Sequence, residues 1–252
     1  MSTRPRVGLF VTCLVDLVRP QIGFAAVKLL EQAGCEVHVP PTQTCCGQPA
    51  WNAGADGHAR EIARNVVAAF EGFDYIVAPS GSCAGMIKRH YPEVFETDAV
   101  WLPRARALAA KTHELLSFLV KVCGMTGVTA QYAKRVCYHD SCSSLREMGV
   151  KAEPRALLAT VGGLSIGELS DPQVCCGFGG LFSVKYPEIS ERMADDKIAD
   201  ACATGAGALI GGDLGCLLHL KGRMARQGKT LEVRHAAEVL ADMGGEPALG
   251  EP

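Results

Sequence analysis

The sequence lacks a long apolar run: no segment approaches the about 20 residues that a membrane-spanning helix requires. It also lacks an excess of either charge, because 25 Lys and Arg side chains are balanced by 27 Asp and Glu side chains and the formal net charge is −2. No basic surface for nucleic acid or for an anionic membrane is therefore expected. We expect no nucleic-acid partner and no direct membrane insertion.

A secretory signal is also missing at the start of the sequence. Residues 1–6 lead straight into the apolar run 7–12, without the long apolar core and cleavage site of such a signal. This pattern predicts a cytoplasmic protein, in a compartment where thiols stay reduced.

Cysteine is the one residue type that stands out. The chain has 252 residues, of which 48% are hydrophobic and 21% are charged, as in ordinary globular proteins. Twelve residues are cysteines, too few for a disulfide scaffold and many for a chain that can bury a core of its own. In a reducing compartment, grouped cysteines indicate metal ligands or redox centres.

The cysteines fall into two matching series. The first series is Cys13, the pair Cys45-Cys46 followed by Gly47, and Cys83; the second is Cys142, the pair Cys175-Cys176 followed by Gly177, and Cys216. The first cysteines of the two series are 129 residues apart, the vicinal pairs 130 and the last cysteines 133. This nearly constant offset predicts two internal repeats, which we place at residues 1–125 and 126–252.

Secondary-structure patterns repeat with the cysteines. Candidate strands lie at 7–12, 36–39 and 75–78 and again at 135–138, 164–169 and 208–210, and candidate helices at 21–32 and 57–71 and again at 154–161 and 187–204. An amphipathic stretch at 104–122 closes the first half, 124–131 is expected to be a linker, and 246–252 a frayed tail. Alternating strands and helices predict an α/β fold of two tandem Rossmann-like βαβ halves with parallel sheets, each bearing a C…CCG…C motif.

Each motif cysteine follows a predicted strand. The carboxyl ends of parallel strands gather at one edge of a sheet, so thiols that are distant in sequence can converge there. Adjacent cysteines serve one centre only if the backbone turns, and Gly47 and Gly177 supply the freedom for that turn. Four thiolates satisfy a [4Fe-4S] cluster. We therefore predict one or two such clusters, with eight cysteine ligands: Cys13, Cys45, Cys46, Cys83, Cys142, Cys175, Cys176 and Cys216.

Two alternatives stay open on the residues alone. Zinc could bind the thiolates, although a vicinal pair fits a multi-iron cluster better than the single small tetrahedron of zinc. The vicinal pairs could instead be redox thiols without a metal, which leaves the distant cysteines of each series without a role. The cysteines that have no equivalent in the other half are expected to be core residues: Cys35, Cys123, Cys137 and Cys202.

Short motifs around the cysteines carry a resemblance to a known family. They are Cys-Cys-Gly-Gln-Pro-Ala at 45–50, Ser-Gly-Ser-Cys at 80–83, Tyr-His-Asp-Ser-Cys at 138–142 and Cys-Cys-Gly-Phe-Gly-Gly at 175–180. With these motifs the chain resembles the CCG, or cysteine-rich, domain family over nearly its whole length, in two tandem copies. Related modules occur in heterodisulfide reductase, in its cysteine-rich B-type component, and in the iron–sulfur subunits of glycolate and glycerol-3-phosphate oxidation systems.

The resemblance implies a function. It points to an iron–sulfur oxidoreductase subunit that transfers electrons in the oxidation of L-lactate to pyruvate, working with ferredoxin-like type B and with type C lactate utilization subunits. Other interpretations remain: a thiol-disulfide reductase like heterodisulfide reductase, an iron–sulfur subunit of glycolate or glycerol-3-phosphate oxidation, or a zinc-binding or metal-free assembly module of a larger redox complex.

The sequence departs from the family pattern, in which each series closes with C-x-x-C. Ser80 and Asp213 stand where the first cysteine of each closing pair would be, and Ser143 stands where a histidine often follows the first cysteine of the second series. Each site is thus one thiolate short. This departure weighs against the five-cysteine non-cubane cluster of the family and favours an ordinary four-thiolate cluster.

A few other residues near the motifs have two interpretations each. His139, expected in a loop, can tune a cluster through a hydrogen bond or be satisfied by backbone at the end of a strand. Asp213 can be an oxygen ligand or hydrogen-bond acceptor, or can simply form its loop. Gln48 and Asn52 can line a pocket beside the first CCG motif, whereas Trp51 is expected in the core.

Overall fold

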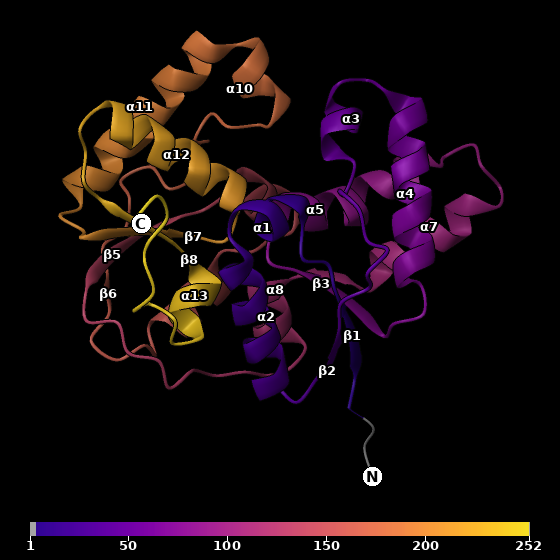
Figure 1. Cartoon of the computed structure of the whole chain (residues 1–252), viewed down its shortest axis with the longest axis horizontal. Helices are drawn as coiled ribbons and strands as arrows, with labels where there is room; N and C mark the ends of the chain where they lie inside the picture. Colours follow the sequence, from indigo (N-terminus) through magenta and orange to yellow (C-terminus); the bar gives the residue numbers. More distant parts are fainter. Residues whose placement is uncertain (1–3, 252) are drawn as a thin grey trace.

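The computed structural model describes residues 4–251 and contains two four-stranded sheets, one in each half of the chain (Figure 1). Strand order is β2-β1-β3-β4 in the first sheet and β6-β5-β7-β8 in the second. The strands are β1 (Arg6–Leu9), β2 (Glu36–His38), β3 (Tyr75–Ala78), β4 (Thr112–Glu114), β5 (Arg135–His139), β6 (Ser165–Ile166), β7 (Ala208–Gly211) and β8 (Glu232–His235). All neighbouring strands are parallel, which confirms the predicted α/β fold with two Rossmann-like halves. Residues 1–3 and 252, which the expected repeats include, lie outside the described residues.

Helices connect the strands and cover the sheets. The first half has α1 (Cys13–Val18), α2 (Pro20–Gln32), α3 (Gln48–Asn52), α4 (Asp56–Phe70), α5 (Gly81–Gly85), the π-helical turn η1 (Met86–His90), α6 (Tyr91–Val94), α7 (Trp101–Ala110) and α8 (Leu115–Lys121). The second half has the π-helical turn η2 (Ser143–Glu147), α9 (Ala152–Leu158), α10 (Leu181–Lys185), α11 (Pro187–Ala203), α12 (Leu214–Arg226) and α13 (Ala236–Leu240). Helices α2, α8 and α13 lie between the two sheets (Figure 1).

Most of the predicted elements are present. Strand β3 has the predicted bounds, and α2, α4 and α11 differ by at most one residue at each end from the helices predicted at 21–32, 57–71 and 187–204. The prediction of one amphipathic stretch at 104–122 is wrong, because this segment holds the end of α7, the strand β4 and α8. Strand β4 carries the buried polar residues Thr112 and Glu114, so no apolar alternation marks it in the sequence. Strand β8 has no counterpart among the predicted elements either.

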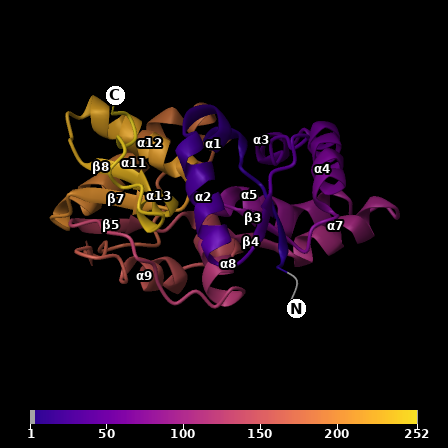
Figure 2. The ribbon, with the colours of Figure 1, turned by 60° about the horizontal axis from the view of Figure 1, so that its bottom comes forward.

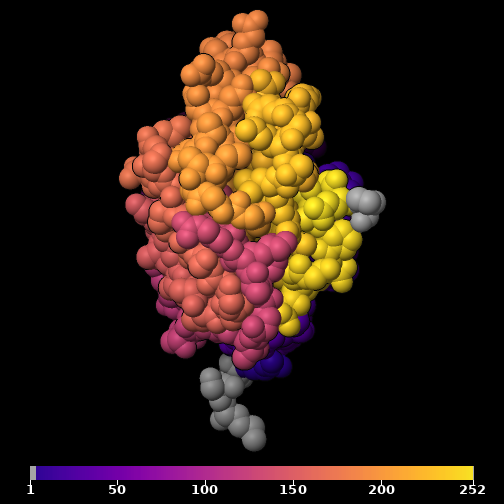
Figure 3. Space-filling view, turned by 90° about the vertical axis from the view of Figure 1, so that its left-hand side faces the viewer, coloured from indigo at the N-terminus to yellow at the C-terminus, as the bar shows by residue number. Residues whose placement is uncertain are grey.

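The C-terminal segment is packed against the second half. The Leu249 amide donates to the Val233 carbonyl oxygen at 3.1 Å, and the Leu249 side chain is buried. Figure 3 shows this yellow segment lying along the surface of the molecule. The expectation of a frayed tail is therefore wrong for residues 246–251. The prediction of a linker at 124–131 agrees with the structure, because residues 124–130 contain neither helix nor strand.

The two halves share a hydrophobic core. One buried cluster contains Val7 and Leu9 of β1 together with Val136 of β5 and Ile210 of β7. Helix α2 packs against α13, and α8 packs against α9, so helices of different halves lie side by side (Figure 2). Burial of apolar surface between the halves stabilises their arrangement. Within residues 4–251, no helix is both long and apolar enough to span a bilayer.

A second set of contacts joins the halves near the motif cysteines. Helix α5, which carries Cys83, packs on η2, which directly follows Cys142; helix α1, which begins at Cys13, packs on α12, which carries Cys216. The first contact is very close, because a Cβ atom on Gly81 would lie 2.7 Å from the Cα atom of Ser144. The helix that carries the closing cysteine of each half therefore packs on the helical segment at the first motif cysteine of the other half.

Candidate metal centres

The motif cysteines lie just beyond the carboxyl ends of strands, at equivalent places in the two halves. In each half the first cysteine follows the central strand β1 or β5, the vicinal pair follows β2 or β6, and the closing cysteine lies in the helix after β3 or β7. Because β1 is hydrogen-bonded to both β2 and β3, the three loops meet at one sheet edge. The same holds for β5, β6 and β7.

The four thiols of the first half form a connected group. Cys13 interacts with Cys45, Cys45 with Cys46, and Cys46 with Cys83. The side-chain contacts with Cys13 and Cys46 lower the pKa of Cys45 to about 2. In turn, the contact with Cys45 and burial raise the pKa of Cys13. The group thus stabilises a thiolate at Cys45, and the thiolate is the form of cysteine that binds metals.

The second half repeats this arrangement. The sulfur atoms of Cys142 and Cys175 lie 3.9 Å apart. Side-chain contacts with Cys142 and Cys176 lower the pKa of Cys175 to about 2, as in the first half, while Cys176 also interacts with Cys216. The structure therefore brings all eight predicted cysteines into two groups of four, which we call the first quartet (Cys13, Cys45, Cys46 and Cys83) and the second quartet (Cys142, Cys175, Cys176 and Cys216).

The turn at each vicinal pair depends on the glycine that follows it. Gly47 and Gly177 adopt φ angles of 83° and 87°, in the left-handed region that favours glycine. Their amide nitrogens lie 3.5 Å and 3.4 Å from the sulfur atoms of Cys45 and Cys175, respectively, and donate hydrogen bonds to them. A Cβ atom on Gly177 would also lie 2.6 Å from the Ser190 carbonyl oxygen. The predicted role of the two glycines is confirmed by this geometry.

The quartets are buried on one side and accessible on the other. Cys46 and Cys176 are 3% and 1% exposed, whereas Cys13 and Cys45 are half-buried. Cys13 and Cys45 line a cavity of about 310 Å³ that also contacts the exposed side chain of Leu17. The first quartet can thus be reached from the surface of the protein.

Two further cavities lie between the halves. One of about 190 Å³ is lined by the whole first quartet, and one of about 180 Å³ is lined by Cys142 and Cys216 of the second quartet. They share five lining residues: Gln48, Ser82, Phe178, Gly180 and Asp213. Gln48 and Asn52 line the second cavity, as the sequence suggested, whereas Trp51 is only partly buried, 5.7 Å from the His90 ring. A single wall therefore separates the cavities that reach the two quartets.

The side chains of Ser80 and Asp213 accept hydrogen bonds from backbone amides. Ser80 Oγ accepts a hydrogen bond from the Cys83 amide at 3.3 Å and caps α5. Asp213 Oδ2 accepts one from the Ser82 amide of the other half at 2.9 Å. Asp213 thus accepts a backbone hydrogen bond at the start of the helix that carries Cys83.

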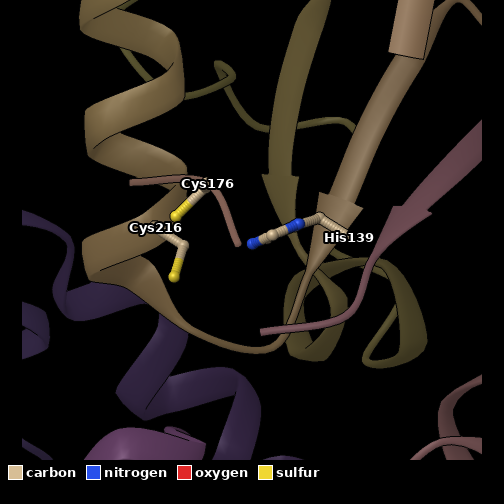
Figure 4. Close-up of side chains that lie close together, drawn as sticks. All are labelled: His139, Cys176 and Cys216. Atoms are coloured by element: carbon tan, nitrogen blue, oxygen red, sulfur yellow. The ribbon is translucent and has the colours of Figure 1, made fainter. Parts of the chain in front are cut away.

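His139 lies among the thiols of the second quartet. It is the last residue of β5 and not a loop residue as expected, it is 1% exposed, and its ligand atom lies within 4.8 Å of the sulfur atoms of Cys176 and Cys216. Figure 4 shows the imidazole ring pointing toward these sulfur atoms. Neither ring nitrogen has a hydrogen-bond partner within residues 4–251, so satisfaction by backbone is wrong. Burial, together with Lys197, lowers the pKa of His139 to about 4, so the ring is neutral at pH 7.

His139 is not among the ligands that the cysteine pattern predicts. The available signal was its position: it precedes Cys142 by three residues at the end of a strand, where a side chain can face the loops that carry the other cysteines. The direction of the ring depends on the register of β5, because successive side chains of a strand point to opposite faces of the sheet.

The remaining cysteines are not members of the quartets. Cys35 and Cys137 are buried in the core, and half-buried Cys123 packs against Cys35 with 3.9 Å between the sulfur atoms. Cys202 is exposed, so its assignment to the core is wrong. It is the next-to-last residue of α11 and lies about 100° around the helix from buried Ala201.

Comparisons with known proteins agree with the repeats. The family described as "Cysteine-rich domain" (CCG) matches residues 7–88 and 136–221. "Lactate utilization protein A" of Exiguobacterium sp. is 48% identical over 238 residues, covering 94% of this chain and 97% of that protein. The protein of the same name from Geobacillus sp. is 49% identical over 235 residues, covering 93% and 98%. "Lactate utilization protein A 1" of Bacillus anthracis is 46% identical over 236 residues, covering 94% and 98%.

Among solved structures, a hypothetical protein from Helicobacter pylori resembles the fold. The TM-score is 0.70 at 10% sequence identity, and the match covers 100% of this chain and 53% of that one. At this identity the likeness concerns the fold alone.

Proposed function

This chain belongs to the cysteine-rich CCG domain family, and on that basis we propose that it is an iron–sulfur subunit that transfers electrons in the oxidation of L-lactate to pyruvate. The observation that carries the proposal is the pair of equivalent thiol quartets, each gathered from three loops at one sheet edge. The names of the relatives supply the substrate. We place the two repeats at residues 1–125 and 126–252, with one centre in each.

The donors of both quartets fit a [4Fe-4S] cluster. Four neighbouring thiols can supply the four thiolates that such a cluster needs, and contacts within each quartet favour the thiolate form of Cys45 and of Cys175 by lowering its pKa. The first cluster would be held by Cys13, Cys45, Cys46 and Cys83, and the second by Cys142, Cys175, Cys176 and Cys216. When bound, such clusters supply one-electron transfer.

The surrounding residues are suited to an electron-transfer role. The amides of Gly47 and Gly177 donate to thiolate sulfur, which disperses negative charge and raises a reduction potential. The half-buried side of Cys13 and Cys45 offers a route to a partner, and the shared wall between the cavities offers a route from one quartet to the other. Asp213 and Ser82 hold this wall together through a hydrogen bond of 2.9 Å.

The proposed partners are ferredoxin-like type B and type C lactate utilization subunits, in the cytoplasm. In this assembly the chain would pass electrons between the subunit that oxidises lactate and a later acceptor.

Iron and sulfide analysis of anaerobically purified protein tests the cofactor. We expect about four iron atoms per intact quartet and an EPR signal from the reduced clusters. The double variant C45S/C46S should lose the first centre only, and C175S/C176S the second only. The matched control is Cys202→Ser, an exposed cysteine outside both quartets, which should keep the full iron content. Iron content that stays unchanged in the double variants would contradict the proposal.

The substrate is tested separately with the assembled system. L-Lactate should reduce the clusters when the type B and type C subunits are present, and C45S/C46S should slow this reduction. Faster reduction by glycolate or by glycerol 3-phosphate would assign the chain to one of those systems. Turnover of disulfides by the isolated reconstituted chain would favour a thiol-disulfide reductase.

One observation favours a second candidate, a zinc-binding assembly module. His139, Cys176 and Cys216 place three donor atoms within 4.8 Å of one another, and mixed Cys and His ligands are typical of structural zinc. Stoichiometric zinc with no iron in the purified chain would support this candidate.

A further inference from the structure

The two halves differ at the position three residues before the first motif cysteine. His139 precedes Cys142 by three residues, and at the equivalent place Phe10 precedes Cys13 by three residues. Phe10 is fully buried and packs on the ring of Phe70, with 5.5 Å between the centroids. A phenyl ring offers no atom that can bind a metal. The first quartet therefore has four donor side chains, whereas the second has four and an imidazole.

The environment of His139 is unusual for a buried histidine. Its ring is 1% exposed, and neither nitrogen has a hydrogen-bond partner within residues 4–251. Leaving a buried polar group without a partner costs free energy, so such a group requires an explanation. The sulfur atoms of Cys176 and Cys216 lie within 4.8 Å of its ligand atom (Figure 4).

Two other histidines, one buried and one half-buried, have hydrogen-bond partners within the fold. His235 is equally buried, but Nε2 lies 3.2 Å from the Pro79 carbonyl oxygen and Nδ1 accepts from the Ala237 amide at 3.1 Å. His219, half-buried beside the second quartet, has Nε2 3.3 Å from Ser190 Oγ. The fold thus provides partners where histidine has a packing or capping role, and it provides none for His139.

We propose that His139 is a nitrogen ligand of the metal centre held by the second quartet. A neutral imidazole with a free lone pair is a common metal ligand, and coordination would satisfy a nitrogen that has no other partner. The second centre then has a mixed Cys and His donor set, whereas the first has thiolates alone. This inference rests on the proposed function and extends it.

The mixed donor set has a functional consequence. A [4Fe-4S] cluster has one terminal position on each of its four irons, so His139 would take the place of one of the four thiolates. That exchange would make the cluster less negative, and histidine ligation in place of thiolate raises the reduction potential of iron–sulfur centres. The second centre would therefore have the higher potential of the two. Electrons that enter at the accessible first quartet would flow across the shared wall toward the second.

Pulsed EPR on the chain labelled with ¹⁵N-histidine tests the ligand directly. In the C45S/C46S background, where only the second centre remains, we expect strong hyperfine coupling to a histidine ring nitrogen. In the C175S/C176S background, where only the first remains, we expect none. The variant His139→Phe, which copies Phe10 of the first half, should abolish the coupling. The matched control His219→Phe removes the other histidine near the second quartet and should keep it.

The labelled chain with native His139 carries the test even if His139→Phe fails to fold. A reduced second centre without ring-nitrogen coupling would overturn the inference, and so would coupling that persists in His139→Phe. Redox titration supplies an independent readout: the midpoint potential of the second centre should become more negative in His139→Phe while that of the first stays the same.

The inference and the proposed function fail in different experiments. A chain that binds no iron contradicts the proposed function, and Co²⁺ alone is then the probe of the donor set. We expect His139→Phe to weaken Co²⁺ binding at the second quartet by at least about 10-fold and to change its absorption spectrum. Binding and spectrum identical to those of the unchanged chain would overturn the assignment of His139.

Discussion

Ser80 and Asp213 meet across the boundary between the two halves, where the Ser80 hydroxyl donates a hydrogen bond of 3.3 Å to Asp213 Oδ2. The same carboxylate oxygen accepts from the Ser82 amide at 2.9 Å. Both side chains thus serve the first turn of α5, although Asp213 belongs to the other half and stands at the start of α12. Ser80 and Asp213, the two residues that depart from the closing C-x-x-C pattern, thus contact each other across the two repeats.

We expect Asp213→Ala to destabilise the chain by about 1.5–3 kcal/mol. The substitution leaves the buried Ser80 hydroxyl and the Ser82 amide without their charged acceptor, and hydrogen bonds to charged groups contribute about this much. Denaturant unfolding of the metal-free protein measures the loss. The control is Asp196→Ala, which removes an exposed carboxylate paired with exposed Arg192 and should change stability by no more than about 0.5 kcal/mol. Equal stability of the two variants would contradict the assigned role of Asp213.

Gly81→Ala tests the close approach of α5 to η2. A Cβ atom there would lie 2.7 Å from both the backbone nitrogen and the Cα atom of Ser144, and backbone atoms cannot move aside cheaply. We expect a loss of about 1–3 kcal/mol from this overpacking. The matched control is Gly222→Ala within α12, where a Cβ atom meets nothing within 4 Å and should stabilise the chain by about 0.4–1 kcal/mol. Thermal unfolding should therefore shift in opposite directions, and a shared direction would count against this packing.

Glu114 makes stability depend on pH. Burial raises its pKa from 4.5 to about 7, with a contribution from the negative charges of Glu153 and Asp213. Between these two values the folded carboxyl holds its proton while the unfolded one has lost it, so stability falls as pH rises. We expect Glu114→Gln, which keeps an oxygen acceptor for the Ser117 amide, to remove about 3 kcal/mol of this fall between pH 5 and 8.

Urea unfolding at several pH values, compared between the two chains, measures this effect. The control Glu188→Gln, at an exposed position, should keep the pH dependence of the unchanged chain. If the free energy of unfolding changes with pH in the same way in Glu114→Gln and in the unchanged chain, folding does not raise the pKa of Glu114.

The duplicated cysteine spacing was enough to predict both quartets. A repeat constrains the fold twice, and since each thiol follows a strand, the rule that parallel strands end at one edge brings distant cysteines together. Regular elements with strong periodicity, such as α4 and α11, were equally accessible. Iron–sulfur binding itself stays a prediction, because the spacing identifies donors and not the metal.

Other features depend on tertiary structure that no local pattern encodes. Strand β4 has three residues and buries the polar side chains of Thr112 and Glu114, so it cannot be recognised before its neighbours are known. The orientation of His139 depends on the pleat of β5, and the contact of Asp213 with α5 depends on how the halves dock. Cys202 was misplaced because one residue near the end of a helix can lie off its buried face.

Removal of the metal should destabilise the protein through both quartets. Each quartet gathers cysteines from three separate segments of the chain, so a metal bound by all four thiolates would link these segments. A ligand that binds only the folded state stabilises it by mass action, so loss of a tightly bound cluster lowers the midpoint of thermal unfolding. We expect anaerobic treatment with an iron chelator to lower this midpoint in the unchanged chain, and to lower it less in C45S/C46S or C175S/C176S, which have one centre to lose. As a control, the midpoint of a chain with all eight cysteines replaced by serine should not change with the chelator. If the midpoint of the unchanged chain does not change when iron is removed, the quartets do not stabilise the fold through a metal.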